Sequence, residues 1–503
     1  MKGITMNQSQ GGFFERTQGT MHPVVIADYS KRRMDSLGAS SGYLLKVMTA
    51  HAVMLAERAI IPRPAAAALA RTLSRWVAEG GIAQERLDPG LEDLYINMEH
   101  LLALELGPEI SGHLPVARSR NDVEAAMWRM ELREKLAALV DELLRHVAIL
   151  GARAEATAEA VMPAYTYDQQ AQPATLGFTL SAYSAALLRD AGRALDCIGR
   201  LDYCPLGAAA AAGTGYPVDR ARTAALLGFK GVLDHAGDCV SASDYMLEGT
   251  GCAVLALTTL ARLAEDVIKW CLNETGFADL PDSLIDSSSI MPQKRNPVIV
   301  AAVRANARLM IGRYAGMLAT CTVPYAASRD VTIVWEETAD CLSVAAGMCR
   351  ISQAYMAEMT FNLEALEQSL RRSFTNTTEI ADTLVRDGGL PFRLAHQIVG
   401  GAVADLFARQ QGPEAMTYEL LNQWSQKVCG ADLPVDPAVL AAAAENRASV
   451  TRRTSFGGTA PSEVRRMVKV QDQQRRELGV TLEALRDHWA QADRALQAAC
   501  AAL

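Results

Sequence analysis

One segment of the chain, residues 287–297, combines three consecutive serines with a lysine and an asparagine, side chains that suit the binding of a carboxylate. Consecutive serines are poor helix and strand formers, and Pro292 cannot lie inside a helix. We therefore expect a mobile surface loop that leads into an apolar helix beginning near Val298. Lys294 and Asn296 would then lie beside the start of that helix, where backbone N–H groups also favour an anion.

A second polar cluster, Ser119-Arg120-Asn121, is suited to another carboxylate. The guanidinium of Arg120 can bind a carboxylate with two parallel hydrogen bonds, and its small polar neighbours can fix the orientation. Followed by Asp122, the same string is also typical of a helix N-cap with a solvated charge. The residue types alone leave both interpretations open.

The elements that must position these residues are predicted to be helices. Apolar residues recur at helical spacing over 44–60 and 65–78, with a Pro-Arg-Pro breaker between them. The pattern lengthens from residue 121, and it returns over 257–270. These stripes indicate core or subunit-contact faces, and long helices with wide apolar stripes favour a helical bundle.

A third region begins near residue 371. It contains the turn-rich string 387–391 and a glycine-containing loop at 455–461, which precedes a charged helix expected to end near residue 478. We therefore predict three helical domains. They cover residues 1–115, with a loose tail at 1–20, then 116–370, then 371–503.

Composition supports an all-α protein without nucleic-acid or membrane partners. In 503 residues only 6% are aromatic, and few stretches alternate as half-buried strands do. The net charge of -8 provides no basic field for nucleic acid or anionic lipid. Apolar runs are too short for a membrane span, and the amino terminus has no signal-peptide pattern.

Cysteine and histidine usage argues against a metal or disulfide framework. The ten cysteines include no C-x-x-C pair, and the eight histidines show no metal-binding spacing. The pattern favours a reduced, cytoplasmic protein with packing cysteines and no metal site.

Several segments, taken in order, resemble the argininosuccinate lyase branch of the aspartase/fumarase superfamily. The loop string S-S-x-M-P-x-K-x-N is similar to the superfamily signature, and further segments follow the branch from about Arg118 onward. The matching segments are 117–122, 171–173, 212–220, 241–244, 287–297, 390–396 and 457–461. Agreement at this many ordered positions is specific to a family.

The resemblance implies an elongated all-α subunit with a central bundle of long helices. It implies a homotetramer whose core combines helices from four chains, with each active site shared between three subunits. That arrangement explains why the candidate residues lie far apart in the sequence. No cofactor is implied, and the partner is a small dicarboxylate or polycarboxylate substrate.

Carried over from the family motifs, each candidate residue has an expected role. Ser288 occupies the position of the catalytic base, acting as an alkoxide that nearby N–H dipoles or Lys294 must activate. The substrate-binding residues would be Ser119, Arg120, Asn121, Thr166, Lys294 and Asn296. Tyr167 stands where the family has histidine, and it is either the proton donor or is not needed for a leaving amine that is already protonated.

The other departures from the family pattern lie mostly on the amine side. Residues 115–116 are Pro-Val where the family has His-Thr, and 327–332 lose the tyrosine and glutamine that contact a guanidinium. The expected Asp-x-Ala-Gly-Ser string before residues 50–52 is absent, and Ser287 replaces a glycine. The positions expected to bind the fumarate-forming part of the substrate match the family pattern. The positions expected to bind the arginine part differ from it.

We therefore expect a cofactor-free carbon–nitrogen lyase that removes fumarate from an N-substituted aspartate other than argininosuccinate by anti elimination. An aminopolycarboxylate such as ethylenediamine-disuccinate is an example of the expected substrate. A true argininosuccinate lyase with altered contacts, a lyase that expels nitrite from nitrosuccinate, and a non-catalytic structural protein like the delta crystallins are the alternatives.

Overall fold

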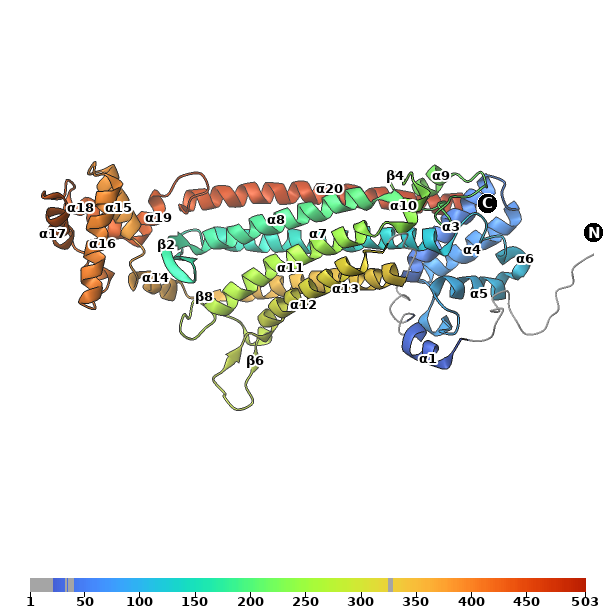
Figure 1. Cartoon of the computed structure of the whole chain (residues 1–503), viewed down its shortest axis with the longest axis horizontal. Coiled ribbons are helices and arrows are strands. Elements are labelled where there is room, and N and C mark those ends of the chain that lie inside the picture. The colour runs from blue at the N-terminus through green and yellow to red at the C-terminus, as the bar shows by residue number, and fades with distance from the viewer. Residues whose placement is uncertain (1–20, 32–33, 35–39, 324–328) are drawn as a thin grey trace, which may run out of the picture.

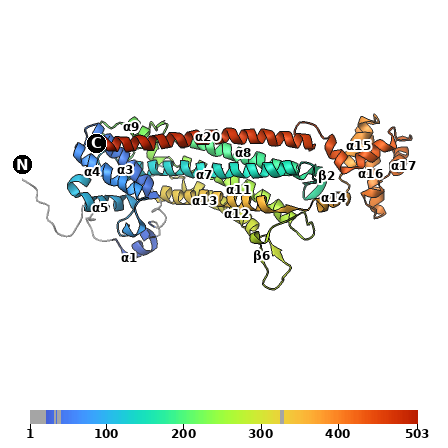
Figure 2. The ribbon, with the colours of Figure 1, turned by 180° about the vertical axis from the view of Figure 1, so that it is seen from behind.

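The computed structural model describes residues 21–31, 34, 40–323 and 329–503. The molecule is an elongated rod in which long helices run side by side, with a helical cap at each end (Figure 1). The chain returns at its end to the cap that contains the first helices, so the C-terminus lies beside α3 (Ser41–Glu57) and α4 (Arg63–Ala78) (Figures 1 and 2). The expectation of an elongated all-α fold is confirmed. The predicted loose tail at 1–20, together with Ala327 and Ser328, lies outside the described residues.

The N-terminal cap is helical and is built around a pair of packed helices. The predicted helices at 44–60 and 65–78 are confirmed as α3 and α4. Asp93 caps the next long helix, because its Oδ1 accepts a hydrogen bond from the backbone N–H of Ile96 at 2.9 Å. The helices of this part are α1 (Pro23–Val25), η1 (Ile26–Ser30), α3 (Ser41–Glu57), α4 (Arg63–Ala78), η3 (Gln84–Arg86), α5 (Leu94–Leu106) and α6 (Pro108–Ser111).

The central bundle consists of long helices whose predicted apolar stripes are buried. The stripe over residues 132–150 faces the core, and so does the stripe over 257–270. Trp128 and Trp335 stack with ring centroids 5.9 Å apart, which fixes two of these helices against each other. The long helices are α7 (Arg120–Ala156), α8 (Leu176–Leu201), α11 (Asp244–Trp270), α12 (Val298–Thr320) and α13 (Arg329–Glu358). The apolar helix expected near Val298 therefore begins at that residue.

Short strands join the helices and were not anticipated from the sequence. Four two-stranded pairs are present in the described residues. Three are antiparallel and β3–β4 is parallel. The strands are β1 (Val161–Thr166), β2 (Gln169–Thr175), β3 (Tyr203–Cys204), β4 (Gly231–Val232), β5 (Ala278–Asp279), β6 (Asp286–Ser287), β7 (Arg295–Asn296) and β8 (Thr360–Phe361). Short helices α9 (Arg220–Leu226), α10 (Ala236–Ser241) and η4 (Asp282–Leu284) accompany them.

The second cap has a small hydrophobic core of its own. Buried residues between 380 and 443, among them Leu384 and Ile398, pack with one another and form a cluster separate from the bundle core. The helices of this part are α14 (Leu363–Arg371), α15 (Thr377–Arg386), α16 (Phe392–Ala408), η5 (Pro413–Ala415), α17 (Tyr418–Cys429), α18 (Pro437–Ala444) and α19 (Asn446–Arg452). The domain boundaries expected from the sequence stay a prediction.

The last helix, α20 (Pro461–Ala501), is longer than expected. It runs back along α7 and α8 for the length of the bundle (Figure 2). The predicted end near residue 478 is wrong, because Gly479 weakens helix propensity only by about 1 kcal/mol. Leu482, Trp489 and Leu496 are buried against the bundle core, and that packing sustains the helix.

Candidate functional site

The predicted carboxylate clamp lies at the N-terminus of α7. Ser119 is the N-cap residue, and its Oγ accepts a hydrogen bond from the backbone N–H of Asn121 at 3.4 Å. In return, Asp122 Oδ1 accepts from the backbone N–H of Ser119 at 2.9 Å, which completes a capping box. The helix cap and the clamp are therefore the same structure, and the helix start positions all three candidate residues.

Arg120 is already paired with two carboxylates. Its Nη1 lies 2.7 Å from Asp93 Oδ2 and 3.1 Å from Glu92 Oε2. Burial lowers the pKa of Arg120, but the two carboxylates outweigh that effect and raise it. About half of the guanidinium side chain remains exposed, so solvent and anions can still reach it. Glu92 and Asp93 thus hold the guanidinium of Arg120 in place.

Asp122 joins the clamp to a neighbouring loop. Its carboxylate is fully buried, and Oδ2 accepts from the backbone N–H groups of Gly207 at 2.9 Å and Ala209 at 2.8 Å. Burial raises the pKa of Asp122, and the bonds from backbone N–H groups partly offset that rise. The carboxylate therefore fixes the start of α7 and the 207–209 loop as one unit.

Ser288 lies just past strand β6, in the loop that joins it to β7. This β6–β7 hairpin projects from the side of the bundle (Figure 1). Ser288 Oγ accepts from the backbone N–H of Met291 at 3.2 Å and of Ile290 at 3.5 Å. Hydrogen bonds that point at this oxygen favour its negatively charged form, which is the requirement for a serine base. Lys294 is exposed and Asn296 is partly exposed on the same hairpin.

Arg295 anchors this hairpin to the segment before it. Its guanidinium lies 2.5 Å from Asp282 Oδ1 and 3.4 Å from Asp279 Oδ1, and it donates to the backbone carbonyl oxygen of Leu280. Asp279 belongs to β5, which pairs with β8. Sequence reasoning missed this anchor, because its partners lie 13 and 16 residues away in a turn region with no periodic pattern.

Thr166 and Tyr167 lie at the tip of the β1–β2 hairpin. Thr166 pairs with Gln169, so Tyr167 and Asp168 form a two-residue turn with φ values of 54° and 57°. Positive φ at both positions is the type I′ geometry of tight hairpins. Thr166 is exposed, and the side chain of Tyr167 is fully exposed.

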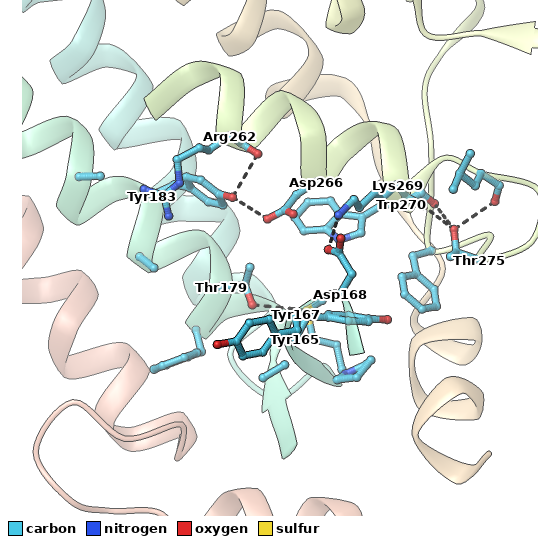
Figure 3. A pocket seen from close by; sticks show the side chains of 18 of the residues that line it. Tyr165, Tyr167, Asp168, Thr179, Tyr183, Arg262, Asp266, Lys269, Trp270 and Thr275 are labelled. Atoms are coloured by element: carbon cyan, nitrogen blue, oxygen red, sulfur yellow. Dashed lines mark hydrogen bonds and ion pairs between the residues drawn. The ribbon is translucent and has the colours of Figure 1, made fainter. Parts of the chain in front are cut away.

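A cavity of about 850 Å³ lies beside this turn, between the hairpin, α8 and α11 (Figure 3). Lys269 Nζ forms a 2.5 Å ion pair with Asp168 Oδ1 at its edge. Tyr183 donates a 2.5 Å hydrogen bond to Asp266 Oδ2 in its wall. The ion pair and the hydrogen bond hold the turn and the two helices in register around the cavity.

The described part of the chain contains no group of three or more His, Cys, Asp or Glu side chains arranged to bind a metal ion. Among the same residues, no helix combines the length and the apolar character that a membrane span requires.

Comparison with known proteins assigns the family. The lyase family pattern matches residues 25–312, and the argininosuccinate lyase C-terminal pattern matches residues 374–444. The argininosuccinate lyase of Methanothrix thermoacetophila is 36% identical over 457 residues, which cover 90% of both chains. That of Chelativorans sp. is 36% identical over 87% of this chain and 92% of its own. The chain belongs to the argininosuccinate lyase branch of the aspartase/fumarase superfamily. It is a fumarate-releasing carbon–nitrogen lyase.

Solved structures agree with this assignment of the fold. EDDS lyase in complex with formate superposes with a TM-score of 0.85 at 27% identity, over 96% of both chains. A 3-carboxy-cis,cis-muconate lactonizing enzyme from Pseudomonas putida shares the fold, with a TM-score of 0.68 at 17% identity over 91% of this chain and all of its own.

In this lyase subunit the candidate residues form two distant groups. Along α7, Arg120 and Arg153 are separated by about 50 Å. The guanidinium of Arg153 lies over the ring of Phe361 in β8, so the β5–β8 pair is at the C-terminal end of α7. Because Arg295 of β7 pairs with Asp279 of β5, the base of the β6–β7 hairpin lies at the same end. The β1–β2 hairpin follows that same end. The clamp therefore lies at one end of the helix, and Ser288, Lys294, Asn296, Thr166 and Tyr167 lie towards the other.

Proposed function

We propose that this lyase catalyses the reversible anti elimination of an N-substituted aspartate to fumarate and an amine, and that its substrate is not argininosuccinate. The observation that carries the proposal is the environment of Ser288. Its oxygen accepts two backbone N–H groups on an exposed hairpin that also presents Lys294 and Asn296. A hydroxyl held in this way is suited to remove a proton beside a carboxylate.

The proposed reaction begins with proton removal by the Ser288 alkoxide from the carbon next to one carboxylate. The aci-carboxylate that forms has two negative charges and is the species that needs stabilisation. Lys294 and Asn296 grip that carboxylate, most strongly once the loop excludes water. Collapse of the carbanion breaks the carbon–nitrogen bond, and the electron pair leaves with the amine.

The remaining candidate residues would hold the other part of the substrate. Ser119, Arg120 and Asn121 bind the second carboxylate, with Arg120 exchanging Glu92 for the substrate. Thr166 contributes a hydroxyl from the β1–β2 turn. Tyr167 occupies the position of the family histidine and is the candidate proton donor to the departing amine.

We also propose that the active site is shared between three subunits of a homotetramer. The clamp lies about 50 Å along α7 from the end that holds both hairpins. The β6–β7 hairpin has 11 residues from Asp286 to Asn296, so it reaches at most about 20 Å from its base. Ile311 and Leu318 on α12 are each about half exposed and lie seven residues apart on the same side of the helix, an apolar pair that suits contact with partner helices.

Two observations favour an amine other than arginine. Tyr167 replaces the family histidine, and EDDS lyase superposes over nearly the whole chain. Argininosuccinate is the second candidate substrate, because the relatives at 36% identity are argininosuccinate lyases. The two candidate substrates differ only in the group attached to the aspartate nitrogen.

Fumarate release tests the proposal. Wild-type protein and Ser288→Ala are incubated with argininosuccinate, ethylenediamine-disuccinate and other N-substituted aspartates, and fumarate is followed by ultraviolet absorbance. We expect release from a substrate without a guanidino group and its loss in the variant. Release from argininosuccinate alone would assign the second candidate. No release from any of these compounds would contradict the proposal and would favour nitrosuccinate as substrate or a structural role like that of the delta crystallins.

A further inference from the structure

A buried carboxyl group lies close to the clamp and has no part in the proposed reaction. Glu99 is on α5, less than two turns after Asp93, the N-cap residue that pairs with Arg120. Only 9% of Glu99 is exposed. A carboxyl group buried to this degree either has partners that stabilise its negative charge or binds a proton.

The partners of Glu99 converge on one of its two oxygens. Tyr95 donates its hydroxyl hydrogen to Glu99 Oε1 at 2.7 Å, and Arg118 Nη2 donates to the same oxygen at 3.0 Å. Arg118 Nη1 also donates to the Tyr95 hydroxyl oxygen, and the guanidinium lies over the Tyr95 ring, 4.7 Å from its centroid. Within the described part of the chain, no group donates to Glu99 Oε2. That oxygen can therefore bind a proton without the loss of a hydrogen bond.

Arg118 joins Glu99 to the start of α7. It directly precedes Ser119, the N-cap residue of that helix, and its Nε donates to the carbonyl oxygen of Leu114 at 2.9 Å. The Arg118 side chain is fully buried. Burial lowers the pKa of Arg118 to about 9, and the carboxylate of Asp122 opposes that shift. Glu99 is therefore coupled through Arg118 to the residues that cap the helix and form the clamp.

The groups around the clamp contain more carboxyl groups than cations. Two guanidinium groups and four carboxyl groups form this acidic cluster, namely Arg118, Arg120, Glu92, Asp93, Glu99 and Asp122. Burial and the charge of Arg118 lower the pKa of His51, on α3, to about 3, so this residue adds no positive charge near neutral pH. A substrate carboxylate would bring one more negative charge. The acidic cluster accepts it most readily when one of its own carboxyl groups is neutral.

Glu99 is the carboxyl group best placed to bind that proton. Burial raises the pKa of Glu99 to about 7, the charge of Asp93 adds to the rise, and the charge of Arg120 opposes it. A carboxylate bound to Arg120 would cancel part of this opposing effect. Protonation of Asp122 would instead weaken its bonds from three backbone N–H groups, and protonation of Asp93 would weaken its ion pair with Arg120.

We propose that Glu99 is a positioning residue of the clamp, and that it takes up a proton when a substrate carboxylate binds to Arg120. The inference rests on the proposed binding role of Arg120 and goes beyond it. Neutral Glu99 still accepts from Tyr95 and Arg118 through Oε1, so the clamp keeps its geometry while the acidic cluster loses one negative charge. Carboxylate binding is then strongest below about pH 7 and weakens as the pH rises through that value.

Calorimetry of fumarate binding counts the proton. Fumarate, which the reaction releases, is titrated into the enzyme at pH 7 in PIPES and in imidazole, two buffers with different enthalpies of ionisation. The difference between the two binding enthalpies gives the number of protons taken up per site. We expect about 0.4 proton per site in the wild type. Between pH 6 and pH 8.5 the Kd of fumarate should rise about fivefold.

Three variants separate the charge of Glu99 from its hydrogen bonds. Glu99→Gln retains the acceptor oxygen and has no proton to bind, so fumarate should bind without proton uptake and with a Kd that changes less than about twofold over the same pH range. Glu99→Ala removes the acceptor and should weaken fumarate binding at every pH. Glu105→Gln removes a carboxylate at an exposed position of the same helix and should behave as the wild type.

The results distinguish failure of the inference from failure of the proposed clamp. Fumarate binding that depends on Arg120 but takes up no proton would overturn the inference alone, and so would equal proton uptake in wild type and Glu99→Gln. Should Glu99→Gln fail to fold, Tyr95→Phe decides. It removes a donor to the ionised carboxylate, so the pH at which binding weakens should move upwards, and an unchanged pH would overturn the inference. An absence of fumarate binding, or binding that Arg120→Ala leaves unaltered, would contradict the clamp and the inference together.

Discussion

The clamp at the start of α7 and the β6–β7 hairpin are built in opposite ways. The clamp is fixed by Asp122, a buried carboxylate that accepts three backbone N–H groups, and by the ion pairs of Arg120. The hairpin is exposed, with Ile290 at its tip 82% accessible, and Arg295 ties it to the segment that precedes it.

In the proposed reaction, this difference would separate substrate binding by the clamp from proton removal by the hairpin. In a clamp that is ordered in the folded protein, the side chains lose their conformational entropy during folding and not on binding. Such a clamp can hold a carboxylate in one geometry. An exposed hairpin can close over a substrate that another part of the assembly holds, and closure excludes water from the developing charge. Substitutions in the clamp should therefore affect stability, and substitutions in the hairpin should affect turnover.

The largest effect is expected from Ser288→Ala. Loss of the base lowers kcat by about a thousandfold or more, while the melting temperature stays near the wild-type value because the side chain is partly exposed. Steady-state kinetics and thermal unfolding measure the two quantities. A comparable loss in Ser289→Ala, the neighbouring serine, would show that the effect does not belong to Ser288.

Asp122→Ala is expected to lower the free energy of unfolding by about 3 kcal/mol, since it leaves three backbone donors without their acceptor. Urea denaturation measures the change. Asp286→Ala, on the exposed hairpin, is the matched control and should alter stability by less than about 0.5 kcal/mol. Equal effects of the two substitutions would remove the contrast between the regions.

Acid should destabilise the clamp end through His51. Burial and the nearby charge of Arg118 lower the pKa of His51 to about 3, although its hydrogen bond to the carbonyl oxygen of Val116 opposes this shift. The unfolded chain binds this proton near pH 6.5, so stability is present above that pH and is lost as the pH falls towards 3. At pH 5 the loss is about 2 kcal/mol.

Urea denaturation at pH 7 and pH 5 checks this value. In His51→Gln the amide can still donate to Val116 and cannot titrate, so the loss between the two pH values should shrink. His488→Gln, at an exposed position, is expected to leave the loss unchanged. An equal loss in wild type and His51→Gln would contradict the role of His51.

The smallest effect concerns the anchor of the hairpin. Arg295→Ala is expected to lower kcat/KM about tenfold through misplacement of Ser288, with a melting temperature near wild type because exposed ion pairs contribute little stability. Arg295→Lys should recover part of the activity. Arg371→Ala removes a similarly exposed ion pair elsewhere and should leave turnover intact. Wild-type kinetics in Arg295→Ala would mean that the hairpin needs no anchor.

The sequence predicted the parts of the fold that depend on local pattern. The stripes over residues 132–150 and 257–270 repeat at helical spacing, so their burial followed directly. The end of α20 did not follow, because packing of Trp489 and Leu496 against distant helices outweighs the weak propensity at Gly479. The start of α7 was predictable as a helix cap from Ser119 and Asp122.

The candidate site was predictable as residue types and only partly as geometry. The pairing of Arg120 with Asp93 and the bond between Asp122 and the 207–209 loop join segments 27 and more residues apart, and no periodicity signals such contacts. A cavity that Asn121 lines likewise depends on the short helix α10, which the tertiary fold brings in.

Complementation between inactive subunits tests most directly whether the clamp and the hairpin act from different chains. Ser288→Ala and Arg120→Ala are each expected to be inactive as pure proteins. When both chains are co-expressed in equal amounts, random assembly gives some sites an intact clamp from one chain and an intact hairpin from another. We predict recovery of about a quarter of wild-type fumarate release in the mixture. A mixture as inactive as its two components would contradict a site shared between subunits.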